Sequence, residues 1–143
     1  MRPDYEKIIQ AIDFFAIKTR GHRVSKLPFL KLIFLADRYH LRMHGRMITN
    51  DHYVAMGYGP VACVSKSVFE FLGLPPQLLD YAAKYLRPEN DRWVRSQCDV
   101  DMDVFSKTDL ESLNAAWETF TKWNREYRGV TNVTHLFPEW KKH

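Results

Sequence analysis

Apolar side chains recur at helical spacing near the start of the chain. Within residues 4–20 they include Ile8, Ile12 and Phe15, which fall on one stripe, and Gly21 follows the last turn. This period is typical of an amphipathic helix, and a glycine just past the last turn is a common helix stop. The pattern predicts a helix that covers the core from one side.

A second segment, about residues 25–44, is apolar on two faces of a helix. Ser25 is suited to cap its start, Pro28 is tolerated in its first turn, and Gly45 is suited to end it. The two faces comprise Leu27, Leu30, Ile33, Phe34 and Leu41 on one side, and Leu32, Ala36, Tyr39 and Met43 on the other. Such a helix is expected to be buried at the centre of the fold.

The pattern changes after Gly45. The segment HYVAM, residues 52–56, is rich in β-forming side chains and predicts a short β segment. Gly59 and Pro60 then predict a helix start, because proline is best tolerated where a backbone N–H has no helical partner. Gly73 is expected to end that helix.

Three further elements are expected in the C-terminal half. A helix should follow the double proline within residues 74–86, and residues 93–98, WVRSQC, predict a short strand. Residues 107–125 carry a regular apolar stripe and predict a long helix. Thr108 and Glu111 have the spacing of a capping box at its start.

These elements predict a mainly α (α+β) fold, a compact single-domain helical bundle around the buried central helix at about 25–44, with a short β segment. The chain of 143 residues, 45% hydrophobic and 14% aromatic, suits one domain over residues 1–143. Cys63 and Cys98 form no disulfide framework and the N-terminus lacks an apolar leader, so a cytoplasmic protein without a membrane segment is expected. The net charge of +4 only weakly favours an acidic partner.

One polar cluster stands out on the predicted central helix. Asp37, His40 and His44 recur at helical spacing, and with His135 they form a candidate set of zinc ligands. A structural zinc site normally uses cysteines, however, and a zinc hydrolase needs the glutamate of H-E-x-x-H, which this stretch lacks. The other interpretation is a buried polar cluster, because Asp37 lies within about 60° of Leu30 on the core-facing stripe.

A buried carboxylate has to be paired or hydrogen-bonded, or it takes up a proton. For Asp37 several partners stay open: a histidine, an arginine from another element, a tyrosine hydroxyl, or the free N–H groups at the helix start after Gly59. Each of these would satisfy Asp37 without a metal ion.

Other motifs do not complete a known site. The stretch DVDMD holds Asp99, Asp101 and Asp103, but Val104 and Leu110 stand where a calcium-binding EF-hand needs glycine and glutamate. The serines and cysteines have no recognisable nucleophile elbow or partnered base around them. No catalytic set is therefore predicted.

Two features are compatible with partner binding. GYGP matches no phosphate-binding loop and predicts a helix cap, with the alternative that the N–H groups of Val61 and Ala62 receive an acidic group from a partner. Lys31, Arg38 and Arg42 form a basic strip on the central helix, either a solvated edge or a partner contact. Three basic residues, without a motif that inserts into a nucleic-acid groove, are too few to indicate nucleic-acid binding. No nucleic-acid partner is therefore expected.

The stretch KLIFLADRYHLRMHGRMITNDHYVAMGYGPV resembles the Panacea domain family, also called SocA-like antitoxins. The family pattern is A-D-x-x-x-L followed by G-x-x-I-T-x-D-x-Y-x-A-x-x-x-G-P-V. The matching positions are Ala36, Asp37, Leu41, Gly45, Ile48, Thr49, Asp51, Tyr53, Ala55, Gly59, Pro60 and Val61. FSKTDLESLNAAW and VTHLFPEW also resemble the C-terminal part of the family.

The resemblance implies an antitoxin, not an enzyme, that neutralises a protein toxin encoded next to it by direct binding and needs no cofactor. A founding member of the family instead delivers its toxin to an ATP-dependent protease, so an adaptor role is the first alternative. A metal-dependent hydrolase or nuclease using Asp37, His40 and His44 is the second. The residues expected to hold the scaffold or contact the toxin are Asp37, Arg38, Thr49, Asp51, Tyr53, Tyr58, Gly59, Pro60, Val61 and Trp140.

Overall fold

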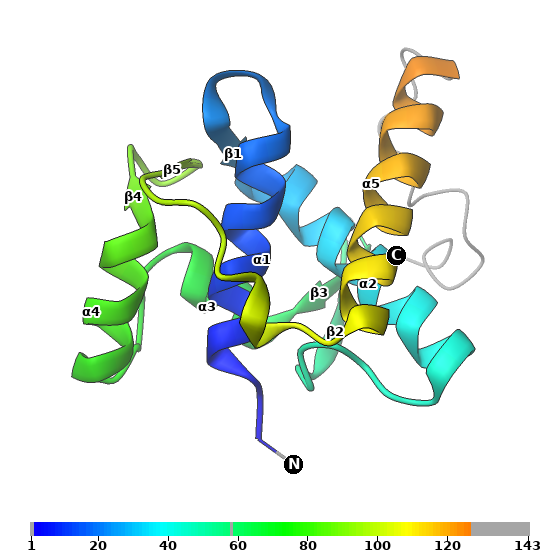
Figure 1. Cartoon of the computed structure of the whole chain (residues 1–143), viewed down its shortest axis with the longest axis horizontal. Coiled ribbons are helices and arrows are strands. Elements are labelled where there is room, and N and C mark those ends of the chain that lie inside the picture. Colours follow the sequence, from blue (N-terminus) through cyan, green and yellow to red (C-terminus); the bar gives the residue numbers. More distant parts are fainter. Residues whose placement is uncertain (1, 58, 127–143) are drawn as a thin grey trace.

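The computed structural model describes residues 2–57 and 59–126, and within them the chain is mainly helical with two small antiparallel sheets (Figure 1). The α-helices are α1 (Tyr5–Lys18), α2 (Lys26–His44), α3 (Cys63–Phe69), α4 (Pro76–Tyr85) and α5 (Lys107–Glu126). The strands are β1 (Arg23–Ser25), β2 (Tyr53–Met56), β3 (Gly59–Ala62), β4 (Leu86–Pro88) and β5 (Trp93–Ser96). The predicted mainly α (α+β) class is confirmed.

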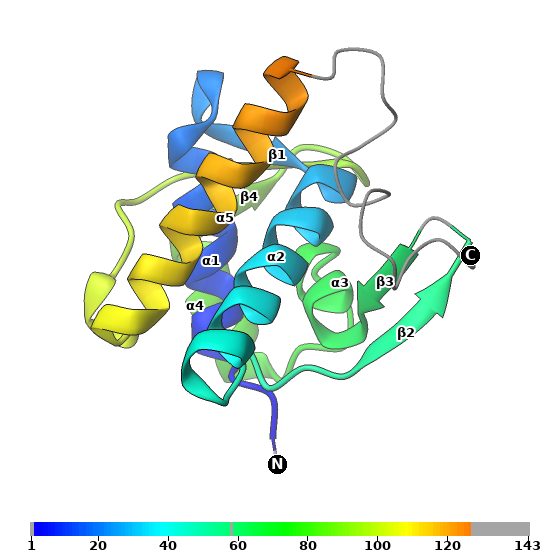
Figure 2. The same cartoon turned by 90° about the vertical axis from the view of Figure 1, so that its right-hand side faces the viewer.

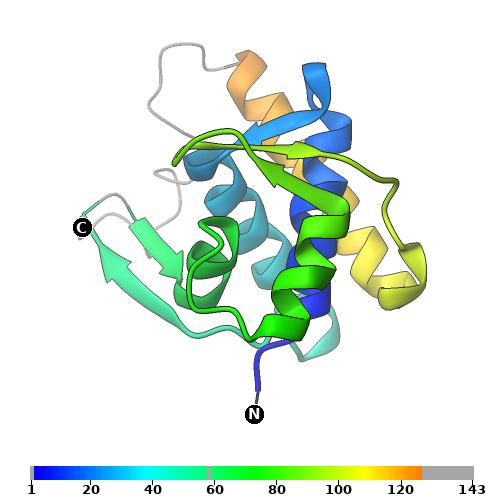
Figure 3. The same cartoon turned by 90° about the vertical axis from the view of Figure 1, so that its left-hand side faces the viewer.

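Helix α1 lies at the centre of the fold and is buried on every side. All nine residues from 8 to 16 are buried, although the sequence pattern predicted only a one-sided stripe. Figures 2 and 3 show the cause: α5 covers one side of α1, and α4 covers another. The polar Gln10 is satisfied in this interior, because its amide donates to the Tyr81 hydroxyl at 2.8 Å and accepts from the Asp101 N–H at 2.9 Å.

Helix α2 lies beside α1 and α5, and its predicted ends are confirmed to within a residue. Gly45 ends it in the left-handed conformation, φ 79°, where its N–H donates to the Leu41 carbonyl at 2.9 Å. Ser25 occupies the N-cap position, but its side chain makes no capping hydrogen bond. Leu27 and Leu41, expected to face the core, are instead 47% and 48% exposed. They lie near the ends of the helix, beyond the elements that bury its middle.

The strands form a three-stranded sheet in the order β1-β5-β4 and a separate β2-β3 hairpin. In the larger sheet Val24 pairs with Val94 and Leu86 pairs with Ser96, all in antiparallel register. The predicted strand at residues 93–98 is confirmed as β5, and the predicted β segment at residues 52–56 is confirmed as β2.

The predicted helix start at Gly59 and Pro60 is wrong. These residues begin β3, which pairs with β2 through Met56 opposite Gly59 and Tyr53 opposite Ala62, and α3 begins only at Cys63. Proline is accepted in an edge strand as well as in a first helical turn, so the same dipeptide is compatible with both. Helix α3 also ends at Phe69, before Gly73.

Helix α5 begins where the sequence predicted, but a different pair of residues caps it. The N–H of Asp109 donates to the Ser106 hydroxyl at 3.0 Å, and the N–H of Ser106 donates to the Asp109 carboxylate at 2.9 Å. This is a capping box two residues before the one predicted at Thr108 and Glu111. Its placement frees the Thr108 side chain to reach α2. In the described part of the chain, no helix is long and apolar enough to cross a lipid bilayer.

Candidate functional site

Asp37, in the middle of α2, holds the segment that follows this helix. Its carboxylate is 2% exposed and accepts four hydrogen bonds. The Ile48 and Thr49 N–H groups donate to Oδ1 at 2.8 and 3.1 Å. The Thr49 hydroxyl at 2.6 Å and the Tyr53 hydroxyl at 2.7 Å donate to Oδ2. Of the partners left open by the sequence, the tyrosine hydroxyl is confirmed.

The titration of this group reflects two opposing effects. Burial raises the pKa of Asp37, while the hydrogen bonds from Thr49, Tyr53 and the backbone oppose the rise. The pKa of Tyr53 is raised well above its ordinary value, by its own burial and then by the neighbouring Asp37 charge. Tyr53 therefore keeps its proton and acts as a hydrogen-bond donor to Asp37.

Thr49 connects Asp37 to Asp51 through hydrogen bonds of its hydroxyl group. The Thr49 hydroxyl, which donates to Asp37, also accepts the Asp51 N–H at 3.1 Å. The Asp51 carboxylate in turn accepts the N–H groups of Val64 at 2.9 Å and Ser65 at 2.6 Å, in the first turn of α3. A carboxylate at this position satisfies free helical N–H groups and interacts favourably with the helix dipole. We call Asp37, Thr49, Asp51 and Tyr53 the carboxylate latch.

The latch corrects the interpretation of GYGP as a helix cap or anion site. Val61 and Ala62 are buried strand residues, paired with Val54 and Tyr53. The helix N-terminus that an acidic group from a partner was expected to reach begins after them, and Asp51 of the same chain fills it.

The other predicted site residues are spread over the fold. Gly59 is buried and Pro60 is half-buried, both on β3, and Arg38 is half-buried on α2. Tyr58, His135 and Trp140 lie outside the described residues. Whether any of these residues contacts a toxin stays a prediction.

A second buried cluster, centred on Asp109 of α5, was missed by the sequence analysis. The fully buried Asp109 carboxylate lies 2.7 Å from Lys7 Nζ of α1 and 3.1 Å from Arg46 Nη2 of the segment after α2. Burial alone would raise the pKa of Asp109, but the hydrogen bonds from Lys7 and Ser106 and the charges of Lys7 and Arg46 lower it. The Ser-x-x-Asp spacing of the capping box was the available signal.

His40 of α2 belongs to this second cluster. Its Nδ1 lies 2.7 Å from the Arg46 carbonyl, which only accepts, so Nδ1 carries a proton. Its Nε2 lies 2.9 Å from the Thr108 hydroxyl and 3.4 Å from Asp109. His40 thus links α2 to α5.

The candidate metal ligands are not gathered around one point. Asp37 points toward Thr49 and Tyr53, and His40 points toward α5. His44 is exposed, and its ring centroid lies 4.7 Å from that of His40. Within residues 2–57 and 59–126, no group of three His, Cys, Asp or Glu side chains is placed to hold a metal ion.

Comparison with known proteins identifies the family to which this chain belongs. The family described as Antitoxin SocA-like, Panacea domain, matches residues 29–141. The chain belongs to this family. No curated protein and no solved structure matches it. The matched region of the Panacea domain contains the whole latch and Asp109, and in this chain both connect elements that are distant in the sequence.

Proposed function

We propose that this Panacea domain is an antitoxin that neutralises its cognate toxin by direct protein–protein binding. The observation that carries the proposal is the family match over residues 29–141. The toxin is expected to be encoded next to the antitoxin, and the two are expected to meet in the cytoplasm.

The contacts within the chain support a binding role over a catalytic one. The buried carboxylates of Asp37 and Asp51 are occupied by donors from their own loops and helix starts, and Asp109 is paired with Lys7 and Arg46. Two hollows, of about 420 and 560 Å³, are lined by cationic, aromatic, aliphatic and hydroxyl side chains, without a carboxylate or a histidine. A carboxylate or a histidine is the commonest general acid or base in enzymes, and neither of these two hollows contains one.

Co-expression with the product of the neighbouring gene tests the proposal. We expect growth arrest by the neighbour alone, rescue by this chain, and co-purification of the two proteins. Toxin abundance separates the mechanisms, because blocking leaves the toxin in a stable complex, whereas an adaptor depletes it in a protease-dependent way. A harmless neighbour, or rescue without a physical complex, would contradict direct neutralisation.

A further inference from the structure

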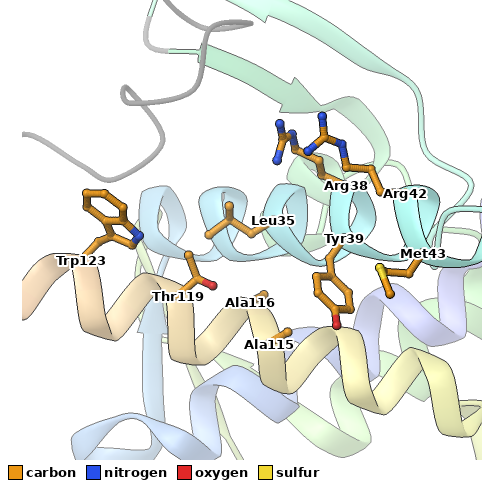
Figure 4. A pocket seen from close by; sticks show the side chains of 9 residues that line it. All are labelled: Leu35, Arg38, Tyr39, Arg42, Met43, Ala115, Ala116, Thr119 and Trp123. Carbon is orange, nitrogen blue, oxygen red and sulfur yellow. The ribbon is translucent and has the colours of Figure 1, made fainter.

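A groove runs between α2 and α5 on the surface of the domain. It has a volume of about 420 Å³, and Figure 4 shows the side chains that line it. Its lining consists of Leu35, Arg38, Tyr39, Arg42, Met43, Ala115, Ala116, Thr119 and Trp123. Because α5 contributes the small side chains Ala115 and Ala116, the two helices leave a channel where larger residues would fill the space.

Large apolar side chains line this channel without being covered by the described residues. Tyr39 is 41% exposed and Met43 is 61% exposed, and the two lie one helical turn apart on the side of α2 that faces α5 (Figure 4). Tyrosine, methionine, tryptophan and arginine are the side chains enriched at protein interfaces. The groove therefore has the composition of a docking surface for another protein segment.

The charge on the groove is of one sign. Arg38 and Arg42 lie on the edge of α2 away from Tyr39 and Met43 (Figure 4), and none of the lining residues is acidic. Arg42 is exposed and forms no ion pair with any residue that the structure describes. Arginine pairs well with carboxylates, so this edge favours a segment with acidic side chains on one side.

The larger hollow near β5 is less suited to the same role. It is lined by Lys26, Lys66, Arg92 and Trp93 among others. Two of its cations are already paired within the chain, since Glu70 lies 2.6 Å from Lys26 Nζ and 3.0 Å from Lys66 Nζ.

We propose that the α2-α5 groove receives an amphipathic helix of the toxin, with apolar side chains against Tyr39 and Met43 and a carboxylate against Arg42. This inference rests on the proposed function and names the surface that performs it. An amphipathic helix fits because α2 and α5 form two walls with the small side chains of Ala115 and Ala116 on one of them, and a helix can lay its apolar face into such a groove.

Two substitutions with matched controls test the groove. Met43→Glu places a charge on the apolar wall, and Leu72→Glu does the same at a residue of equal exposure, 60% against 61%, away from the groove. Arg42→Glu reverses the charge of the edge, and Arg92→Glu is its control in the other hollow. The measurement is the Kd of the complex with the purified toxin, in a non-toxic variant, at two salt concentrations.

We expect Met43→Glu to weaken toxin binding roughly tenfold or more. Arg42→Glu should weaken it to a similar extent, mainly through slower association, and should reduce its salt dependence. Both control variants should bind as the wild type does. Thermal unfolding of all four variants close to that of the wild type would show that the loss is not caused by unfolding.

A photo-crosslinking residue at position 119 identifies the occupant. We expect an adduct with a toxin segment that carries acidic residues at helical spacing, and no adduct from position 79 on α4. If both groove variants bind the toxin normally, or position 119 crosslinks to a second copy of this chain, the groove assignment is overturned while the antitoxin function stands. If the wild type binds no toxin at all, the proposed function itself fails.

Discussion

Asp37 and Asp13 are both buried aspartates in central helices, and they have opposite surroundings. Asp37 accepts four hydrogen bonds, whereas neither oxygen of Asp13 has a hydrogen-bond partner among the described residues. Burial raises the pKa of Asp13 to about 7; the nearby Ser96 side chain, which donates its hydrogen bond to the Cys98 carbonyl, opposes the rise, and the Asp99 charge adds to it. Burial alone therefore does not define the role of a carboxylate. With hydrogen-bond donors around it, as at Asp37, it stabilises a loop; without them, as at Asp13, its pKa rises toward neutral pH.

The largest expected effect is that of Asp37→Ala. The substitution leaves the Ile48 and Thr49 N–H groups and the Tyr53 hydroxyl without their acceptor. Losing several buried hydrogen bonds to one charged group should lower the free energy of unfolding by about 3–5 kcal/mol. Urea unfolding at pH 7 measures it, and Asp37→Asn, which keeps one oxygen acceptor, should lose less. Equal stability of Asp37→Ala and the wild type would contradict the claim that the latch stabilises the fold.

Asp109→Asn is expected to cost somewhat less, about 2–3 kcal/mol at pH 7, because it removes a charge paired with Lys7 and Arg46. The pKa of Asp109 is lowered in the folded protein, so its contribution is present above the ordinary value of 3.8 and is lost as the pH falls below it. The difference between variant and wild type should therefore shrink when urea unfolding is repeated near pH 3. A difference that is independent of pH would contradict the ion-pair assignment.

Asp37 and Asp13 also show how much of the structure the sequence pattern can predict. Helical periodicity placed Asp37 on the core side of α2, and Gly45 correctly marked the end of that helix. Periodicity could not reveal that α1 is covered on all sides, because its other faces contact α3, α4 and β5, which follow much later in the chain. Asp13, on a face expected to be exposed, was therefore not noticed.

The remaining errors come from local motifs with two valid solutions. Gly59-Pro60 suits both an edge strand and a helix start, and the hairpin with β2 decides between them. The residues at the start of α5 contain two overlapping capping boxes, and the ion pair with Lys7 favours the one that uses Asp109. The local motif alone decides neither case: the first depends on the pairing of β3 with β2, and the second on the ion pair between Lys7 and Asp109.

Tyr53→Phe makes Asp37 more like Asp13, because it takes away one hydrogen-bond donor. It removes one of the two hydroxyl donors to Oδ2 and leaves the Thr49 hydroxyl in place. We expect a loss of about 1.5 kcal/mol at pH 7, typical of one hydrogen bond to a charged group. The pKa of Asp37 should rise further, so the loss should be smaller at acidic pH, where a protonated carboxyl needs fewer donors. Carbon-13 NMR of labelled aspartate carboxyls measures that pKa directly, and an unchanged value would contradict the contact.

Asp13→Asn should have the opposite sign, and its effect should be small at acidic pH. The folded pKa of about 7 lies above the ordinary 3.8, so the wild type loses stability as the pH rises from about 4 to about 7, where the unfolded carboxyl is ionised and the buried one still holds its proton. Asparagine stays neutral, so the stability of the variant relative to the wild type should increase between pH 5 and pH 8, by roughly 1–3 kcal/mol for a folded pKa near 7. Thermal unfolding at the two pH values measures the change, and Asp80→Asn on the exposed face of α4 is the control. A gain that is equal at both pH values would mean that folded Asp13 is already ionised at pH 5, and its contrast with Asp37 would then lie in packing and not in charge.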